Sequence, residues 1–189
     1  RRHTRYGTVT GVQTCALPIS WFNPFRSWHK AAKGKPHASH VSQKAPQLCV
    51  QHGDYQWMDP GEPLAQKWSL ATVQDVVRNY DVDGVHIDDY FYPYPEGKQF
   101  ADADSFAKYQ KGGGKLARSA WRRQNVDTYV KAMHDLVHKE KPWVAVGISP
   151  FGIARPGVPK GIVAGVDQYE DLAADVPRWL REGWLDRSE

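Results

Sequence analysis

The sequence has little cysteine and no long apolar run. Cys15 and Cys49 are the two cysteines among 189 residues, and their spacing matches no metal-binding motif, so the redox compartment stays open. No stretch of about 18 apolar residues is present, which excludes a transmembrane helix. No charged and then apolar amino-terminal segment resembles a signal peptide, so we expect neither an anchor nor an export signal in this stretch.

Acidic residues are missing from the first part of the chain, where no aspartate or glutamate precedes Asp54. The net charge of +4 therefore has a local origin, and without residues 1–19 and 187–189 the remaining body is nearly neutral, with no basic face. We accordingly expect no nucleic-acid partner. The basic residues before Asp54 are Arg1, Arg2, Arg5, Arg26, Lys30, Lys33, Lys35 and Lys44.

The two ends of the chain read differently from its body. Residues 1–20 have neither a helical nor a strand period, and residues 16–19 and 187–189 are what a sequencing adapter and its reverse complement would encode. We expect residues 1–19 and 187–189 to be non-native flanks of a genuine body, residues 20–186. The alternative is an ordinary disordered tail.

Strand-like and helix-like segments alternate through this body, which is typical of an α/β fold with a parallel sheet. Three or four strands can be counted where a closed barrel needs eight, so we predict part of a (β/α)8 TIM-type barrel that is incomplete at both ends. The expected strands are residues 21–26, 47–51, 83–88 and 143–150. The expected helices are residues 64–79, 103–109, 118–140 and 172–182, with an exposed excursion through Gln43 and a turn at residues 57–61. Leu64, Trp68, Ala71 and Val76 mark the inward stripe of the first long helix.

Two adjacent carboxylates, Asp88 and Asp89, follow the strand at residues 83–88 and precede a loop rich in tyrosine and proline. Hydrolysis of a glycosidic bond needs two carboxyl groups, one protonated and one ionised, so both are candidate catalytic residues. Neighbours in a strand point to opposite faces, and we favour Asp88 because it shares a face with His86, whose imidazole could hold it by a hydrogen bond. The alternative gives one aspartate a turn-capping role and the other an ion pair.

The candidate substrate-binding residues surround this pair. Tyrosine rings stack on sugars and exclude water, although some rings of the loop could instead pack beneath it as core. Asn23 and Arg26 could bind substrate hydroxyls, hold a catalytic acid in its charged form, or tether a loop. The candidates are Asn23, Arg26, His86, Tyr90, Tyr92 and Tyr94. No second carboxylate has a specific signature among Asp59, Glu96, Asp167, Glu170 and Asp171.

Other chemistries receive less support from these motifs. His86 with Asp88 and Asp89 lacks the second histidine or the glutamate of a zinc centre, so we expect no metal and no cofactor there. Ser149 precedes Pro150 and has no nucleophile-elbow glycines, which argues against a Ser-His-Asp triad. A non-catalytic glycan-binding barrel and a metal-dependent carbohydrate deacetylase remain alternatives to a glycosidase.

The motifs together resemble the bacterial family-10-like glycosyl hydrolases, and the likeness is carried by residues 21–24, 59–61, 80–93, 121–123, 147–152 and 179–184. This resemblance implies a TIM-type barrel that hydrolyses O-glycosyl bonds, with peptidoglycan glycan stripped of peptides as a plausible polysaccharide substrate. It also implies an extracytoplasmic place, secreted or at the cell envelope, with membrane contact through a lipid anchor outside this chain. The family continues beyond residue 186 and begins earlier, so we expect this stretch alone to be unstable or inactive.

Overall fold

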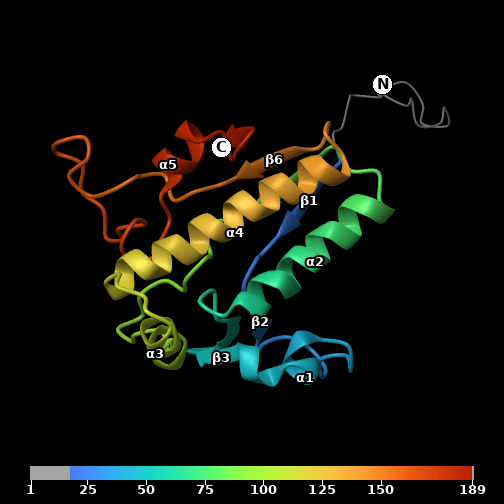
Figure 1. The fold of residues 1–189 in the computed structure, drawn as a ribbon, viewed down its shortest axis with the longest axis horizontal. Coiled ribbons are helices and arrows are strands. Elements are labelled where there is room, and N and C mark those ends of the chain that lie inside the picture. The colour runs from blue at the N-terminus through green and yellow to red at the C-terminus, as the bar shows by residue number, and fades with distance from the viewer. Residues whose placement is uncertain (1–17, 189) are drawn as a thin grey trace.

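The computed structural model describes residues 18–188, and its central feature is a sheet of four parallel strands (Figure 1). The strand order is β1-β5-β6-β7, so each parallel strand along the chain is added beside the previous one. Helical segments connect these strands, as expected for β/α units. The predicted α/β class is confirmed. The strands are β1 (Ile19–Phe22), β5 (Gly84–Ile87), β6 (Ala145–Ile148) and β7 (Arg187–Ser188).

The register of the parallel sheet separates its side chains into two faces. Trp21 lies beside His86, which lies beside Gly147, so these three residues share one face. Ile87 and Ile148, one register row further on, share the opposite face and are fully buried in the apolar core. The helices cover this second face, whereas Trp21 on the first face is 63% exposed.

Two long helices, α2 (Pro63–Asn79) and α4 (Arg118–Glu140), lie side by side over the sheet (Figure 1). Pro63 stands in the first turn of α2, where a missing backbone N–H costs nothing. Between the helices, the Ser69 Oγ and the Tyr129 hydroxyl lie 2.8 Å apart in a hydrogen bond, and burial raises the pKa of Tyr129. The bond satisfies both polar groups inside the core.

The buried stripe of α2 agrees with the predicted one only in part, because Trp68 and Val76 are half-buried against the core whereas Leu64 and Ala71 are exposed. It consists of Ala65, Ser69, Val73 and Val77. Leu64 is 58% exposed, and it lines an open hollow of about 640 Å³ with Trp68, Ala71 and the 45–48 segment. Ser69 is polar in the sequence but buried in the fold, since Tyr129 satisfies its hydroxyl, and this explains the wrong prediction.

Helix α4 confirms its predicted bounds, and it holds the shorter α5 in place. Its buried stripe repeats at the three- and four-residue spacing that predicted the helix, and Pro142 follows its end. The buried Asp127 on α4 accepts hydrogen bonds of 2.6 Å from the Trp179 indole and of 2.6 Å from the Arg178 guanidinium. The remaining helices are α3 (Ala103–Lys111) and α5 (Val176–Arg181).

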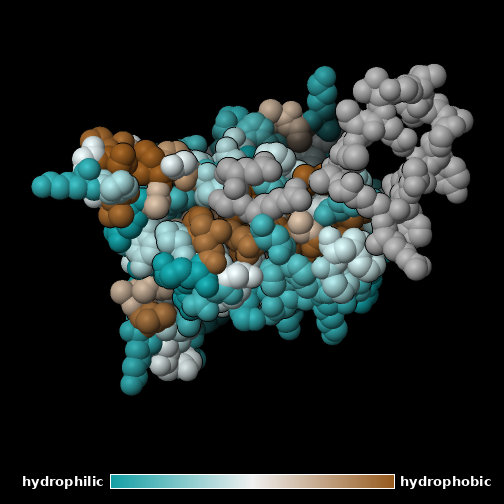
Figure 2. All heavy atoms as spheres, turned by 90° about the horizontal axis from the view of Figure 1, so that it is seen from above, coloured by the Kyte–Doolittle hydropathy of each residue, from teal (hydrophilic) through white to brown (hydrophobic). Residues whose placement is uncertain are grey.

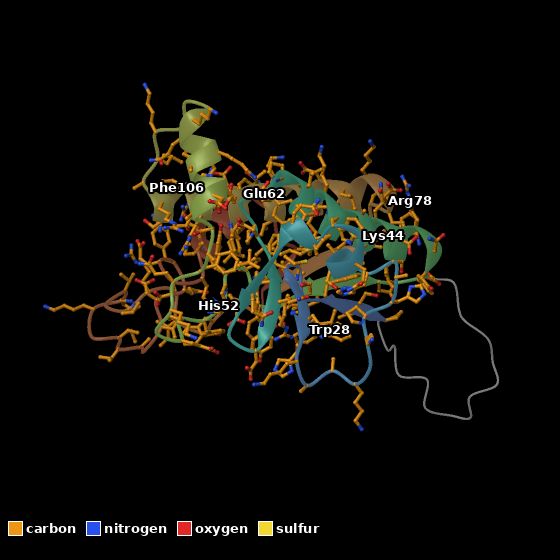
Figure 3. The ribbon with its side chains drawn as sticks, turned by 90° about the horizontal axis from the view of Figure 1, so that it is seen from below. Trp28, Lys44, His52, Glu62, Arg78 and Phe106 are labelled. Carbon is orange, nitrogen blue, oxygen red and sulfur yellow. The ribbon has the colours of Figure 1, made fainter. Side chains whose placement is uncertain are left out.

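A separate antiparallel sheet with the order β2-β4-β3 forms the excursion between β1 and α2. Figure 3 labels Trp28 and His52 on this sheet, and Phe106 on the projecting α3. The predicted turn at residues 57–61 is wrong in its first half, because Trp57 and Met58 end strand β4 and are buried. The elements are β2 (Arg26–His29), α1 (Val41–Lys44), the 3-10 turn η1 (Pro46–Leu48), β3 (Cys49–His52) and β4 (Tyr55–Met58).

The first expected boundary of the body falls inside β1, and the second falls immediately before β7. Ile19 begins β1 opposite Gly84, and Arg187 pairs with Gly147 in β7. The rest of the expected flanks, residues 1–17 and 189, lie outside the described residues, as does Cys15. Within residues 18–188, no helix has the length and apolarity to cross a membrane. Seen from above, apolar side chains gather along the middle of the molecule (Figure 2).

Candidate active site

The carboxyl ends of β1, β5 and β6 bring three polar residues together. Asn23, Asp88 and Ser149 each follow the last residue of one of these strands. A hydrogen bond of 3.0 Å from the Ser149 backbone N–H to the Ile87 carbonyl continues the pairing of β5 and β6 as far as these three residues. The carboxyl ends of parallel strands are where barrel enzymes place their catalytic residues.

Asp88 is held by its neighbours and is partly buried. The Asn23 side-chain amide donates to both carboxylate oxygens, at 3.3 Å and 3.5 Å. Partial burial raises the pKa of Asp88, and the charge of Asp89 acts in the same direction. The Tyr90 backbone N–H, the Arg26 charge and the Asn23 amide lower this pKa without cancelling the rise. Asp88 therefore retains a proton to a higher pH than an ordinary aspartate.

Asp89 is oriented by the loop that follows it. The Tyr94 hydroxyl donates a hydrogen bond to Oδ2 of Asp89. Burial raises the pKa of Tyr94, and the hydrogen bond to Asp89 adds to this, so the hydroxyl stays protonated as the donor. The two adjacent aspartates consequently have different partners, Asn23 for one and Tyr94 for the other.

His86 lies two residues before Asp88 on β5, and its hydrogen-bond partner is not the predicted one. Its Nε2 lies 2.7 Å from the Ser149 Oγ in a hydrogen bond, and its ring packs against Trp21 with centroids 4.6 Å apart. The predicted hydrogen bond to Asp88 is wrong, because the imidazole is committed to Ser149 on the adjacent strand. Direct substrate contact is wrong as well, since His86 is 5% exposed.

Arg26 and Tyr90 form the side of the site nearest the antiparallel sheet. The Arg26 guanidinium carbon lies 4.8 Å from the Tyr90 ring centroid, and its backbone N–H donates to Oδ1 of Asn23 at 2.8 Å. Tyr90 also contacts Tyr94, whose ring lies near Phe151 in the loop after β6. Asn23, Arg26, Tyr90 and Tyr94 are thus brought to the two aspartates.

Tyr92 is the exception among the predicted substrate-binding tyrosines, and its prediction is wrong. It is 1% exposed, packs edge-on against Phe100, and lies under the Arg122 guanidinium. Burial raises its pKa well above the ordinary value. Phe91 beside it is also buried, and the Trp57 indole donates to the Phe91 carbonyl at 2.9 Å. Phe91 and Tyr92 therefore pack beneath the loop as part of the core, which was the alternative to substrate binding.

The other candidate carboxylates have structural partners of their own. Asp59 is buried, and it accepts hydrogen bonds of 2.5 Å from the Ser105 hydroxyl and 2.8 Å from the Gly61 N–H. Asp167 accepts from the Tyr169 N–H, and its own N–H donates to Asp171. Glu170 pairs with Arg123 at 2.9 Å, and Glu96 lies in an exposed loop near Gly53. Asp89 is therefore the carboxylate beside Asp88.

Three site neighbours had no predicted role: Trp21, Ser149 and Phe151. The side-chain parity of β1 could have found Trp21, because it lies two residues before Asn23 on the same face. The motif at residues 147–152 marks Ser149 and Phe151, but their place beside His86 and Tyr94 depends on the packing of β6 against β5.

Fold and site together define a glycosyl-hydrolase-like α/β protein, with paired aspartates and tyrosines at the carboxyl end of a parallel sheet. The chain belongs to the family described as Glycosyl hydrolase-like 10, which matches residues 18–188. It is 37% identical over 173 residues to glycosyl hydrolase YngK of Bacillus subtilis (strain 168), and 35% identical over 179 residues to glycosyl hydrolase DigH of Escherichia coli (strain K12).

These two alignments cover 88% of this chain but 34% of YngK and 40% of DigH, so the chain spans well under half of either relative. Among solved structures, alpha-L-fucosidase isoenzyme 2 from Paenibacillus thiaminolyticus matches with a TM-score of 0.45 and 17% identity. That match covers 62% of this chain and 19% of the fucosidase.

Proposed function

We propose that the protein is a glycoside hydrolase that cleaves O-glycosyl bonds of a polysaccharide, with peptide-free peptidoglycan glycan as its substrate. The observation that carries the proposal is a partly buried Asp88 with a raised pKa, next to a second carboxylate, at the carboxyl end of β5. The family supports the same chemistry. We also propose that the four parallel strands are part of a (β/α)8 barrel, which their sequential order supports.

Asp88 acts as the general acid in this proposal. A carboxyl group with a raised pKa keeps its proton to a higher pH than an ordinary aspartate and can give it to the departing glycosidic oxygen. After the transfer, the Asn23 amide and the Arg26 charge stabilise the carboxylate that is left. If Asp89 attacks the sugar, the proton returns when Asp88 serves as the base toward water; if Asp89 activates the water instead, Asp88 regains its proton from solvent after the products leave.

Asp89 supplies the second carboxylate required by the same chemistry. The hydrogen bond from Tyr94 orients its carboxylate, which leaves the other oxygen for the reacting sugar or for a water molecule. The half-buried rings of Tyr90 and Tyr94 offer faces on which sugar rings stack, while Arg26 braces Tyr90. Trp21 on β1 offers a further exposed ring beside His86.

The proposed polysaccharide substrate determines which partner and which location we propose. The partner is a glycan, with no nucleic acid involved, and contact with a membrane comes through a lipid anchor outside this chain. An envelope glycan lies outside the cytoplasm, so the enzyme works there.

The test compares hydrolysis and binding of purified peptide-free glycan strands by the full-length wild-type protein, Asp88→Asn and Asp89→Asn. Each variant should lose at least about a hundredfold in kcat, the usual contribution of a general acid or base, and should still bind glycan. Asp171→Asn is the matched control, because that carboxylate serves the 167–171 loop.

The outcomes separate the candidate functions. Full activity in both aspartate variants would remove these carboxylates from the mechanism. A wild-type protein that binds glycan and hydrolyses none would indicate a glycan-binding barrel. Release of acetate, lost after chelation, would indicate a carbohydrate deacetylase.

A further inference from the structure

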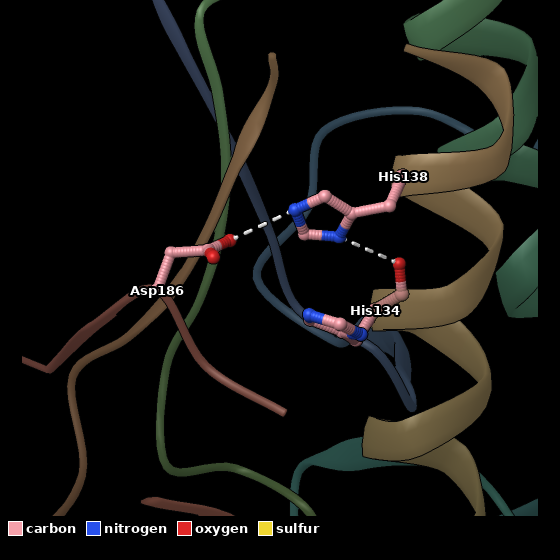
Figure 4. Close-up of side chains that lie close together, drawn as sticks. All are labelled: His134, His138 and Asp186. Atoms are coloured by element: carbon pink, nitrogen blue, oxygen red, sulfur yellow. Dashed lines mark hydrogen bonds and ion pairs between the residues drawn. The ribbon is translucent and has the colours of Figure 1, made fainter. Parts of the chain in front are cut away.

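His134, His138 and Asp186 form a cluster at the opposite end of the parallel sheet from Asp88 (Figure 4). The histidines are one turn apart on α4, with ring centroids 4.2 Å apart. Asp186 precedes β7, and its Oδ2 accepts a 2.8 Å hydrogen bond from the N–H of Val146, near the amino end of β6. The sheet therefore holds the carboxylate facing the helix.

The hydrogen bonds decide where the protons of the two rings lie. Nδ1 of His138 lies 3.0 Å from the His134 carbonyl, and because a carbonyl can only accept, this nitrogen carries a proton. In a neutral imidazole, Nε2 is then unprotonated, and it faces Oδ2 of Asp186 at 3.3 Å. Nδ1 of His134 lies 3.5 Å from Oδ1 of Asp135, which leaves its Nε2 free as well.

Two acceptor atoms at this separation suit two ligands of one bound metal ion. We propose that His134, His138 and Asp186 bind a zinc ion. The proposal is independent of the glycosidase chemistry, because it involves the other end of the strands.

The ligand set and the distances suit zinc. Two histidines at positions i and i+4 of a helix with a carboxylate from another segment are a recurring zinc arrangement. Bonds of 2.0–2.2 Å at tetrahedral angles put ligand atoms roughly 3.3 Å apart, the separation between His138 Nε2 and Asp186 Oδ2. All three ligand atoms lie within 4.8 Å of one another, and the partly exposed His134 ring has room to turn toward the other two.

The second shell resembles that of known metal sites. A metal-binding histidine usually donates its other N–H to a carbonyl or carboxylate, as His138 does to the His134 carbonyl. The fourth position is open to water, since all three side chains are partly exposed. A bound zinc ion would fasten the segment that enters β7 to α4 and so stabilise the fold.

The experiment uses the full-length protein, stripped of metal and titrated with Zn²⁺ and Co²⁺. We expect one ion per chain, a tetrahedral Co²⁺ absorption band, and a Tm raised by several degrees with Zn²⁺. His134→Ala should abolish all three effects while keeping the His138–Asp186 pair, so it separates a metal site from a simple ion pair. Asp186→Asn should abolish them as well.

His40→Ala is the matched control, because His40 serves the N-terminus of α1 at a distance from this cluster. It should bind the metal as the wild type does. Failure of the wild type to bind Zn²⁺, equal binding by His134→Ala and the wild type, or loss of binding in His40→Ala would each overturn the proposal.

Discussion

The side-chain amide of Asn23 donates to both oxygens of Asp88, although the two residues lie 65 positions apart in the sequence. They meet because β1 and β5 are adjacent and parallel, so that both strands end at the same edge of the sheet. The amide stabilises the ionised form of a carboxyl group that burial keeps closer to neutral. Catalytic behaviour should therefore respond to changes at Asn23.

Asn23→Ala should shift the alkaline limb of the pH–rate profile to higher pH. The amide lowers the pKa of Asp88, so its loss lets that pKa rise further, and a general acid stays protonated to a higher pH. The measurement is kcat/KM on glycan as a function of pH. Asn79→Ala, on an exposed part of α2, is the control. An unchanged limb, or a limb at lower pH, would contradict the assignment of Asp88.

Arg26→Met should move the same limb in the same direction, because the Arg26 charge also lowers the pKa of Asp88. Arg26→Lys keeps the charge but loses the planar contact with Tyr90, so its limb should stay near that of the wild type. The two variants thus separate charge from stacking. If the alkaline limb moves equally in both variants, the pKa of Asp88 depends on the shape of the guanidinium rather than on its charge.

Tyr90→Ala should raise KM for glycan about fivefold, since loss of a stacked ring costs about 1 kcal/mol. Tyr92→Phe should leave KM unchanged, because Tyr92 is buried beneath the loop. Steady-state kinetics on glycan strands of one length measure both. An equal rise in KM in the two variants would contradict the assignment of Tyr90 to the binding surface and of Tyr92 to the core.

Asp127→Ala should lower the free energy of unfolding by about 2 kcal/mol, because it leaves the buried Trp179 indole without an acceptor and removes the Arg178 pair. Asp75→Ala, an exposed aspartate on α2, should change it by less than about 0.5 kcal/mol. Urea unfolding measures both values. Equal losses would show that Asp127 does not anchor α5.

Glu140→Gln should flatten the loss of stability on acidification. Hydrogen bonds from Arg78 and then from Gln74 lower the pKa of Glu140 below its ordinary 4.5. The stability linked to a lowered carboxyl pKa is present above the ordinary value and disappears as pH falls through the folded-state value. Tm measured between pH 6 and about pH 3 should therefore fall less steeply in the variant. A steeper fall would reverse the sign of this linkage.

The sequence predicted the parallel α/β framework well, for a physical reason. Helix α4 and strands β5 and β6 have strong periodic patterns, and each is stopped by proline or by a polar turn. The antiparallel sheet was predicted only as one short strand and an excursion. Its strands have four residues each, and their pairing joins Arg26 to Trp57 across a long loop, which local patterns do not encode.

The sequence predicted most of the residues that gather at the candidate site but not every contact among them. Asp88, Asp89, Asn23, Tyr90 and Tyr94 come together as local patterns suggested. The burial of Tyr92 and the commitment of His86 to Ser149 depend on which segments pack against the loop. The His134 and His138 spacing is visible in the sequence, but Asp186 joins them only through the β6–β7 pairing.

The excursion between β1 and α2 closes on itself, since the Met58 backbone N–H donates to the Phe25 carbonyl at 2.7 Å. A segment whose exit and re-entry points touch can lengthen, shorten or be exchanged while the strands around it keep their positions. Because Arg26 begins this segment, packs against Tyr90 and lowers the pKa of Asp88 by its charge, such exchange would change the surroundings of Asp88 without moving the strand that carries it.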